Sequence, residues 1–169
     1  ATVRKGLAMG AGSAIHIADE ALVGADLGLT AEVLAAALRR TDFDLVIAGN
    51  LSTDGSGGVL PAMLAELLDV PSATALNSVE LGAGQVSGGR ASDGATMRVT
   101  AALPAVISIT ERLPDARFPN FKGIMAAKKK PFETLTLEDL GVEPEDHSAS
   151  HSIVIGLGEK PPREAGVKI

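Results

Sequence analysis

Residues 44–68 read DLVIAGNLSTDGSGGVLPAMLAELL, and this stretch decides the fold of the chain. Its first part, residues 44–48, is a short apolar run that predicts a fully buried β-strand. Its last part, from Val59 to Leu68, repeats apolar residues at the spacing of an amphipathic helix. A strand, a glycine-rich loop and a helix in succession form the repeating unit of α/β folds with a parallel sheet.

The segment before this unit continues the alternation. Residues 2–11 predict the last turns of a helix that Gly10 closes, because glycine is favourable just past a helix end. Residues 14–17 form a short apolar run that predicts a strand. Residues 30–39 predict a helix that begins at the cap Thr30.

The segment after the unit adds strands of two kinds. Residues 73–79 predict another strand of the alternating pattern. Residues 79–102 contain short extended runs separated by glycine-rich turns, which is typical of β-hairpins. Residues 105–109 are apolar enough to return to the buried sheet. We therefore predict an α/β fold: an open, mostly parallel sheet with flanking helices and a β-hairpin excursion.

The last third of the chain is less regular. Residues 111–130 fit neither the helix nor the strand period, and Pro114 and Pro119 forbid a continuous helix, so we predict a long ordered loop. Thr136 predicts a brief capped helix over the letters LEDLG.

Two regions follow from this pattern. We expect one nucleotide-binding domain over residues 1–142, incomplete at its N-terminus because the chain opens at Ala1 without an initiator methionine. Residues 143–169 then form a polar linker and an extended C-terminal arm.

Composition excludes several classes of protein. The 169 residues carry a formal net charge of -6, which argues against a nucleic-acid binder. The absence of cysteine excludes disulfides and thiolate catalysis, so any redox chemistry must come from a bound cofactor. Neither a run of 18 apolar residues nor a leader is visible. We expect a cytoplasmic protein without membrane insertion.

The glycine-rich loop after the strand at residues 44–48 is the first candidate site. Open α/β sheets bind ligands at this position. A helix N-terminus offers free backbone NH groups to a phosphate, and glycines let the phosphate approach them, so we predict that an adenine nucleotide binds here. No Walker lysine follows, and the spacing is not GxGxxG. The alternative is a tight turn in which Asp54 caps the next helix. The candidate nucleotide-binding residues are Gly49, Asn50, Leu51, Ser52, Thr53, Asp54, Gly55, Ser56, Gly57, Gly58, Val59 and Leu60.

No catalytic or metal site is predicted. The loop has hydroxyl groups but no general base beside them. His16 lies inside a predicted strand, where a lone histidine is usually structural, and His147 and His151 lie in the Ser-rich tail. The acidic pairs near residues 138 and 145 are most simply a helix cap and a solvated linker.

Residues 117–131, RFPNFKGIMAAKKKP, are the second candidate site. Apolar anchors beside lysines suit a surface that binds an acidic partner, because the anchors enter a pocket and the lysines raise the association rate. The alternative is that Phe118 and Ile124 pack onto the core and the lysines are merely solvated. The candidate partner-binding residues are Arg117, Phe118, Phe121, Ile124, Met125, Lys128, Lys129 and Lys130.

Five stretches together resemble the beta subunits of electron transfer flavoproteins. These are AMGA at 8–11, DLVIAGNLSTDG at 44–55, LPAVIS at 103–108, GIMAAKKKP at 123–131 and EDLGV at 138–142. The resemblance covers nearly the whole chain. Its most specific parts are the Asp-Gly loop and the run that ends in three lysines.

The resemblance implies an adenine nucleotide alpha hydrolase-like fold and a heterodimer with an alpha subunit. The alpha subunit chiefly holds the redox FAD. The loop at residues 49–60 would wrap the phosphate of a structural AMP, with Asp54 at the acidic position of the family, or would hold a second FAD in electron-bifurcating members. Residues 117–130 resemble the family's recognition loop, and Phe121 stands where a leucine anchor is common. Ala91 replaces an acidic residue that many members have.

The function that the resemblance implies is that of an electron carrier rather than an independent enzyme. Such a carrier accepts electrons from flavin dehydrogenases, for example the acyl-CoA dehydrogenases of fatty acid oxidation, and passes them to the respiratory chain through a quinone oxidoreductase. The family's opening strand and helix, which complete the adenine pocket, would precede Ala1. The alternatives are a bifurcating subunit with a second FAD and a stand-alone stress-type module that binds an adenine nucleotide.

Overall fold

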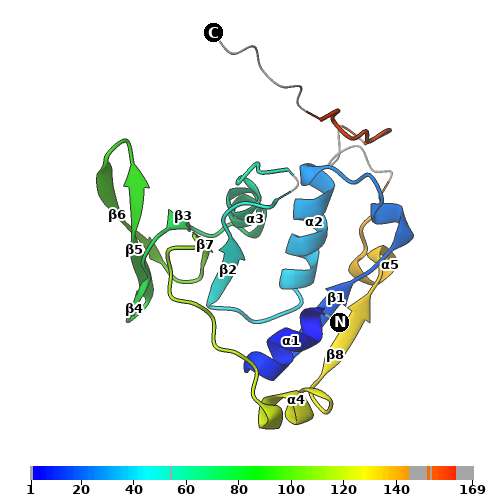
Figure 1. Cartoon of the computed structure of the whole chain (residues 1–169), viewed down its shortest axis with the longest axis horizontal. Helices are drawn as coiled ribbons and strands as arrows, with labels where there is room; N and C mark the ends of the chain where they lie inside the picture. The colour runs from blue at the N-terminus through cyan, green and yellow to red at the C-terminus, as the bar shows by residue number, and fades with distance from the viewer. Residues whose placement is uncertain (1, 54, 145–151, 153, 163–169) are drawn as a thin grey trace.

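The computed structural model describes residues 2–53, 55–144, 152 and 154–162. Figure 1 shows a central parallel sheet with an antiparallel arm on one side and a second parallel pair of strands on the other. Helices flank the parallel strands, so the predicted α/β class is confirmed. Within the described ranges, no helix is both long and apolar enough to cross a membrane.

The central sheet has the strand order β2-β7-β3. It consists of β2 (Leu45–Gly49), β7 (Ala105–Ile109) and β3 (Ser72–Leu76), and both pairings are parallel. Helix α3 (Leu60–Leu68) packs on β7 and β3. It ends at Asp69, which adopts the left-handed conformation with φ of 54°. The predicted sequence of strand, glycine-rich loop and helix is therefore confirmed.

An antiparallel arm covers part of this sheet. Strands β4 (Glu80–Gly82), β5 (Gln85–Ser92) and β6 (Ala95–Ala102) form it, as the hairpin pattern predicted. Burial of apolar side chains between the arm and the sheet drives their association. The buried cluster consists of Ala73, Leu76, Val86, Ala101, Ala105 and Ile107.

The second parallel pair joins β1 (Ala14–Ile17) to β8 (Phe132–Leu135). The short helix η1 (Glu20–Leu22) follows β1, and α2 (Leu27–Leu38) and α5 (Leu137–Leu140) supply apolar side chains. A second buried cluster contains Leu29, Val33, Leu137 and Val142, with Ile17 packed against it. The predicted cap of α5 is confirmed, because Thr136 and Asp139 form a capping box.

Helices α1 (Thr2–Met9) and α4 (Phe121–Ala127) pack together at one end of the molecule. Figure 1 shows α1 beside β8 and α4 below it, both away from the carboxyl ends of β1 and β2. Gly10 ends α1 with φ of 128°, a backbone conformation that favours glycine.

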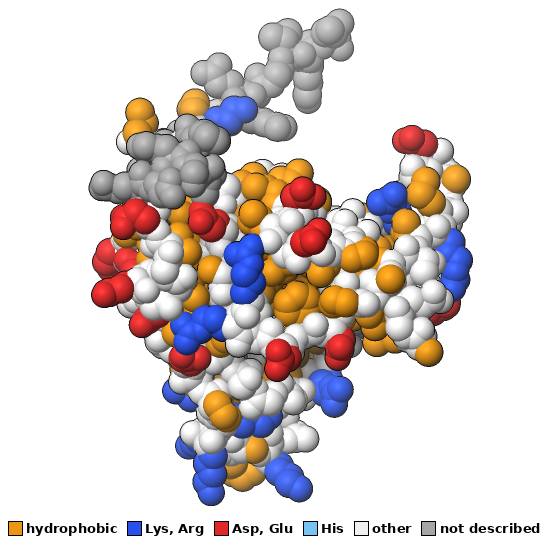
Figure 2. Space-filling view, turned by 180° about the vertical axis from the view of Figure 1, so that it is seen from behind, with side chains coloured by type: hydrophobic (Ala, Val, Ile, Leu, Met, Phe, Trp, Pro, Cys, Tyr) orange, Lys and Arg blue, Asp and Glu red, His pale blue; other side chains and the backbone are white. Residues whose placement is uncertain are grey.

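The prediction that residues 44–48 form a fully buried strand is wrong. Strand β2 pairs only with β7 among the described strands, so its other edge is open, and the Ile47 side chain is 58% exposed. Strand β1 likewise pairs only with β8. The parallel strands therefore form two sheets with an open edge each, and Figure 2 shows apolar side chains gathered in the middle of the rear face between the arm and the β1–β8 pair.

Two local predictions are also corrected. Helix α2 begins three residues before Thr30, because the Asp26 carboxylate accepts a hydrogen bond from the Leu29 NH at 2.9 Å and is the N-cap. Residues 111–130 are not all loop: Asn120 caps α4 through the Gly123 NH at 2.7 Å. The strand β8 was not predicted, since its residues FETL form neither an apolar run nor a regular alternation of apolar and polar residues.

Candidate functional site

The glycine-rich loop connects the carboxyl end of β2 to the start of α3. Figure 1 shows it between α3 and the beginning of α2, at the same end of the molecule as the carboxyl end of β1. Its turn is held by Ser56, whose NH and Oγ both donate to the Ser52 carbonyl oxygen, at 3.2 and 3.1 Å. Ser56 has φ of 49° and Gly58 has φ of 66°, so the backbone here uses the left-handed region twice.

The N-cap residue of α3 is Val59, which makes no side-chain capping bond, and Pro61 occupies the first turn. Pro61 has no NH group, and the NH groups of Ala62 and Met63 both donate to the Val59 carbonyl oxygen, at 3.0 and 3.1 Å. The alternative in which Asp54 caps this helix stays untested, because Asp54 lies outside the described residues. The backbone of the loop, rather than the first turn of α3, is therefore the part that a phosphate could approach.

Glycines leave open space around the loop. A Cβ atom on Gly49 would meet no atom within 4 Å, and one on Gly55 would meet only Ser52 Oγ at 3.9 Å. On Gly57, a Cβ atom would lie 3.7 Å from the Leu27 side chain, which places the loop against the start of α2. This backbone can approach a phosphate closely, so the residues present fit the phosphate of an adenine nucleotide.

An exposed apolar surface surrounds the loop. Leu51 is 61% exposed, Val59 46% and Leu27 48%. The other described loop positions from Gly49 to Gly57, which exclude Asp54, are exposed or half-buried, and Gly58 and Leu60 are half-buried. Apolar side chains beside a glycine-rich turn suit a ligand that has both an aromatic base and a phosphate.

The C-terminal arm touches the same end of the molecule. The Val154 NH donates to the Gly24 carbonyl oxygen at 3.1 Å, and Ser152 Oγ donates to the Asp26 carboxylate at 3.0 Å. Residues 152 and 154–162 have no helix or strand, as the extended arm predicts, while residues 145–151 of the predicted linker lie outside the described residues. Ile155 and Leu157 are each 96% exposed.

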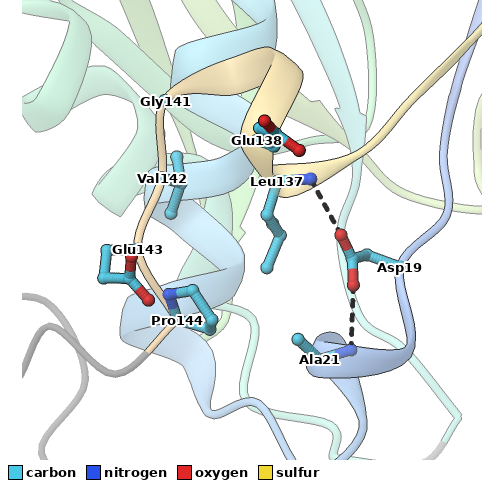
Figure 3. A pocket seen from close by; sticks show the side chains of 8 residues that line it. All are labelled: Asp19, Ala21, Leu137, Glu138, Gly141, Val142, Glu143 and Pro144. Carbon is cyan, nitrogen blue, oxygen red and sulfur yellow. Dashed lines mark hydrogen bonds between the residues drawn. The ribbon is translucent and has the colours of Figure 1, made fainter.

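A cavity of about 530 Å³ lies between η1 and α5 (Figure 3). The Asp19 carboxylate bridges its two walls by accepting hydrogen bonds from the Ala21 NH and the Leu137 NH, each at 3.0 Å. These bonds, that from Ala21 first, lower the pKa of Asp19 below its ordinary value. Glu138 and Glu143 also line the cavity, so its charge disfavours a phosphate.

A smaller cavity of about 420 Å³ lies at the carboxyl end of β1, lined by residues from His16 to Val23. The loop at residues 49–60 lines neither of these two cavities. The His16 ring lies 6.4 Å from that of Phe132, and the Arg4 guanidinium lies over the Phe132 ring at 4.5 Å. His16 is thus part of a surface cluster of side chains.

Other groups considered for catalysis have structural partners or lie outside the description. Thr136 donates to Asp139 from both its NH and its Oγ, and these bonds lower the pKa of the Asp139 carboxyl. Glu145, Asp146, His147 and His151 lie outside the described residues. Across the described part of the chain, no group of three or more histidine or acidic side chains is placed to hold a metal ion.

The second candidate site lies on α4 and the segment before it. Phe118 is 91% exposed and Phe121 80%, while Ile124 and Met125 are 47% exposed. The alternative in which Phe118 and Ile124 pack onto the core is therefore excluded. Arg117, Lys128 and Lys129 are exposed as well. Figure 2 shows basic side chains gathered with apolar ones at this tip of the molecule.

Lys130 is placed differently from the two lysines before it. It is half-buried, and its Nζ donates to the carbonyl oxygens of Leu7 at 2.8 Å and Ala11 at 2.6 Å. Both acceptors lie at the C-terminal end of α1. The structure therefore brings seven of the eight predicted partner-binding residues to an exposed surface and turns Lys130 toward α1.

One group was missed from the sequence, and the contacts of another were not foreseen. Asp19 accepts a hydrogen bond from the Leu137 NH, 118 positions away, and only its place just before an apolar turn could have marked it as a cap. Lys130 was among the predicted partner-binding residues, but its contact with α1 was not predicted. Its one local difference from Lys128 and Lys129 is that it stands beside Pro131.

Comparison with known proteins gives a family for this arrangement. The model of the "Electron transfer flavoprotein domain" family matches residues 1–140. The chain is similar to "Electron transfer flavoprotein subunit beta" of Mycobacterium tuberculosis, at 44% identity over 170 residues that cover 99% of this chain and 64% of that protein. It is 35% identical to the protein of the same name from Mus musculus, over 99% of this chain and 65% of that protein.

The protein of this name from Bacillus subtilis is 34% identical over 145 residues, which cover 85% of this chain and 56% of that protein. The chain thus spans about 64% of the length of the mycobacterial relatives.

Proposed function

The chain belongs to the electron transfer flavoprotein domain family, and from this premise we propose that it acts as the small subunit of an electron transfer flavoprotein. In this role it pairs with an alpha subunit that holds the redox FAD. The heterodimer accepts electrons from flavin dehydrogenases, such as the acyl-CoA dehydrogenases of fatty acid oxidation, and delivers them to a quinone oxidoreductase. A chain of 169 residues without cysteine fits the cytoplasmic location that we propose.

The observation that carries this proposal is the outer surface of α4. Phe121 is 80% exposed on a helix whose flanks carry Lys128 and Lys129. A large exposed aromatic side chain costs solubility unless a partner covers it, and aromatic side chains are typical anchors at interfaces. The lysines favour a partner with acidic groups around its pocket. We propose that the dehydrogenase docks here.

The bound FAD and the residues of this chain have separate roles in the proposed function. FAD, when bound, supplies the electron transfer itself. The residues of this chain orient the complex: α4 selects the dehydrogenase, and the exposed arm at Ile155 and Leu157 offers apolar side chains to the alpha subunit. No group in the described residues needs to give or take a proton. We therefore propose an electron carrier subunit rather than an independent enzyme.

We also propose that the loop from Gly49 to Leu60 binds the phosphate of AMP. The left-handed backbone at Ser56 and Gly58 and the open space at Gly49 and Gly55 support this role. The open edges of β1 and β2 support a further proposal, that an additional parallel strand lies between them in the longer relatives. Such a strand would complete one sheet of the adenine nucleotide alpha hydrolase-like kind and one wall of the nucleotide site.

The test of the dehydrogenase surface is the substitution Phe121→Ala in the complex with the alpha subunit. We expect the KM of an acyl-CoA dehydrogenase for the flavoprotein to rise about tenfold or more, because truncating an interface anchor costs at least about 2 kcal/mol. FAD content should be unchanged, since we assign the redox FAD to the alpha subunit, and AMP content should be unchanged, since α4, which begins at Phe121, lies at the opposite end of the molecule from the loop (Figure 1). An unchanged KM would exclude α4 as the docking surface.

The nucleotide assignment is tested by denaturing the same complex and quantifying released nucleotides by chromatography. One FAD with one AMP supports the proposal. Two FAD per heterodimer would identify an electron-bifurcating protein with a second FAD in this chain. Binding of AMP or ATP by this chain with no flavin-containing complex would instead identify a stand-alone nucleotide-binding module.

A further inference from the structure

Helix α4 has two faces of opposite character. The face toward α1 carries small residues, Gly123 and the buried Ala127, which are four positions apart and therefore lie one turn apart on the same side. A methyl group on Gly123 would overlap the backbone carbonyl oxygen of Ala8, so α4 lies directly against the α1 backbone. The other face carries the exposed Phe121, Ile124 and Met125.

Helix α4 is too short to keep its conformation and position without contacts from the rest of the protein. Seven residues make two turns, and isolated helices so short are unstable in water. The segment before α4, residues 111–120, has no helix or strand and cannot fix the angle of the helix. The direction in which Phe121 points therefore depends on contacts with α1.

Lys130 supplies the polar part of these contacts. Its ammonium group donates to the Leu7 and Ala11 carbonyl oxygens at 2.8 and 2.6 Å, so one side chain binds both sides of the turn at Gly10. The C-terminal end of a helix carries a partial negative charge, which a lysine ammonium neutralises. The next residues begin β8, where the Ala14 NH donates to the Pro131 carbonyl oxygen at 3.1 Å. Lys130 thus joins the end of α4, the end of α1 and the start of the β1–β8 pair.

We propose that Lys130 is a positioning residue for the dehydrogenase surface: it acts through α4, by fixing this helix on α1, and does not touch the partner. This inference rests on the proposed function, because it takes the outer face of α4 as the docking site. Under this proposal the three consecutive lysines have two roles. Lys128 and Lys129 are exposed to solvent, whereas Lys130 orients the apolar anchors of α4.

The experiment compares Lys130→Met with Lys129→Met in the complex with the alpha subunit. Both substitutions remove one positive charge, so high ionic strength screens the loss of charge steering in both. Under these conditions we expect Lys130→Met to raise the KM of an acyl-CoA dehydrogenase for the flavoprotein about threefold to tenfold with little change in kcat, because two charge-assisted hydrogen bonds are lost. Lys129→Met removes an exposed charge of the docking surface itself, and at high salt it should change the KM less than Lys130→Met does.

Two further measurements separate positioning from general stability. Amide hydrogen exchange should increase in residues 121–127 of Lys130→Met while the amides of β7 stay protected. Lys130→Arg keeps a charged donor and should restore most of the KM. If Lys130→Met yields too little folded complex, Lys130→Gln serves in the same comparison, since its amide group retains a donor.

The outcomes also separate this inference from the docking proposal. If Phe121→Ala raises the KM and Lys130→Met does not, the positioning role is refuted and the docking surface stands. If Phe121→Ala leaves the KM unchanged, the docking proposal fails and the positioning role fails with it. A raised KM in both variants, with a smaller change in Lys129→Met at high salt, supports both.

Discussion

The glycine-rich loop and the outer face of α4 lie at opposite ends of the molecule and are built in opposite ways (Figure 1). The loop is shaped by its own backbone: a turn held by Ser56 and Ser52, followed by Gly58 in the left-handed region. Helix α4 is shaped by a contact distant in sequence, from Lys130 to the end of α1. A site for a small anion needs backbone freedom, whereas a docking surface needs a rigid support.

The comparison implies different costs of binding. Gly49, Gly55 and Gly57 are exposed glycines of the loop, so a bound phosphate would have to restrict a backbone with much conformational freedom. The side chains of α4 already point outward, and a partner would have little ordering to impose on them. Substitutions in the loop should therefore act through backbone conformation, and substitutions on α4 through side-chain contact and charge.

The largest effect among the tests of this contrast is expected at Gly58. Its φ of 66° is strained for alanine, and a Cβ atom there would lie 2.8 Å from Leu51 Cδ2. We expect Gly58→Ala to weaken AMP binding by the alpha–beta complex about tenfold, because a left-handed alanine costs about 1–2 kcal/mol. Titration calorimetry with AMP measures the change.

Gly58→Asn is the matched control for this test. Asparagine also adds a Cβ atom next to Leu51 but adopts the left-handed region more readily than alanine. It should retain most of the AMP affinity. Equal losses in the two variants would show that bulk, rather than backbone conformation, controls the loop.

The parts of the fold that the sequence predicts are those with a local cause. The strand, loop and helix over residues 44–68 and the capping box at Thr136 depend on neighbouring residues, and both are confirmed. The pairing of β1 with β8 joins segments more than a hundred residues apart, so no local pattern contains it. Ile47 illustrates the same limit: an apolar run predicts burial, but the available neighbours decide it.

The candidate sites divide in the same way. The twelve predicted loop residues are contiguous, so a pattern of glycines next to a strand was enough to propose them as a site, and their role stays a prediction. The exposure of Phe118 and Phe121 could not be predicted, because an aromatic side chain in a loop can equally pack inward. The contact of Lys130 with Leu7 joins residues 123 positions apart and is visible only in three dimensions.

An intermediate effect is expected from the exposed lysines on α4. We predict that the double substitution Lys128→Ser and Lys129→Ser lowers the association rate with an acyl-CoA dehydrogenase about threefold to tenfold at low salt, because charge complementarity speeds encounter. Near 1 M salt the difference should disappear, since the screening length falls to about 3 Å. Stopped-flow measurement of flavoprotein reduction at several salt concentrations gives these rates.

The effect of Phe121→Ala provides the contrast for the lysines. An apolar contact is not screened, so the raised KM of this variant should persist at high salt. A salt-independent loss of rate in the double lysine variant would mean that these lysines make direct contacts rather than steer the partner.

The smallest effect is expected at Asp19, which belongs to neither region and therefore tests their independence. Hydrogen bonds from Ala21 and Leu137 lower its pKa below the ordinary value of 3.8, so the unfolded chain binds this proton more readily than the folded protein does. The carboxylate therefore stabilises the fold fully at pH values above 3.8, and this contribution is lost as the pH falls through the folded pKa.

Asp19→Asn keeps one acceptor oxygen for two amide donors and should lower the urea midpoint modestly at pH 7. The difference from the unsubstituted protein should shrink as the pH approaches 3, whereas a constant difference would show that the charge of Asp19 contributes nothing. AMP affinity and the KM of the dehydrogenase, both measured at pH 7, should not change in this variant, because its bonds join η1 to α5 and reach neither the turn at Ser56 nor the contact of Lys130 with α1.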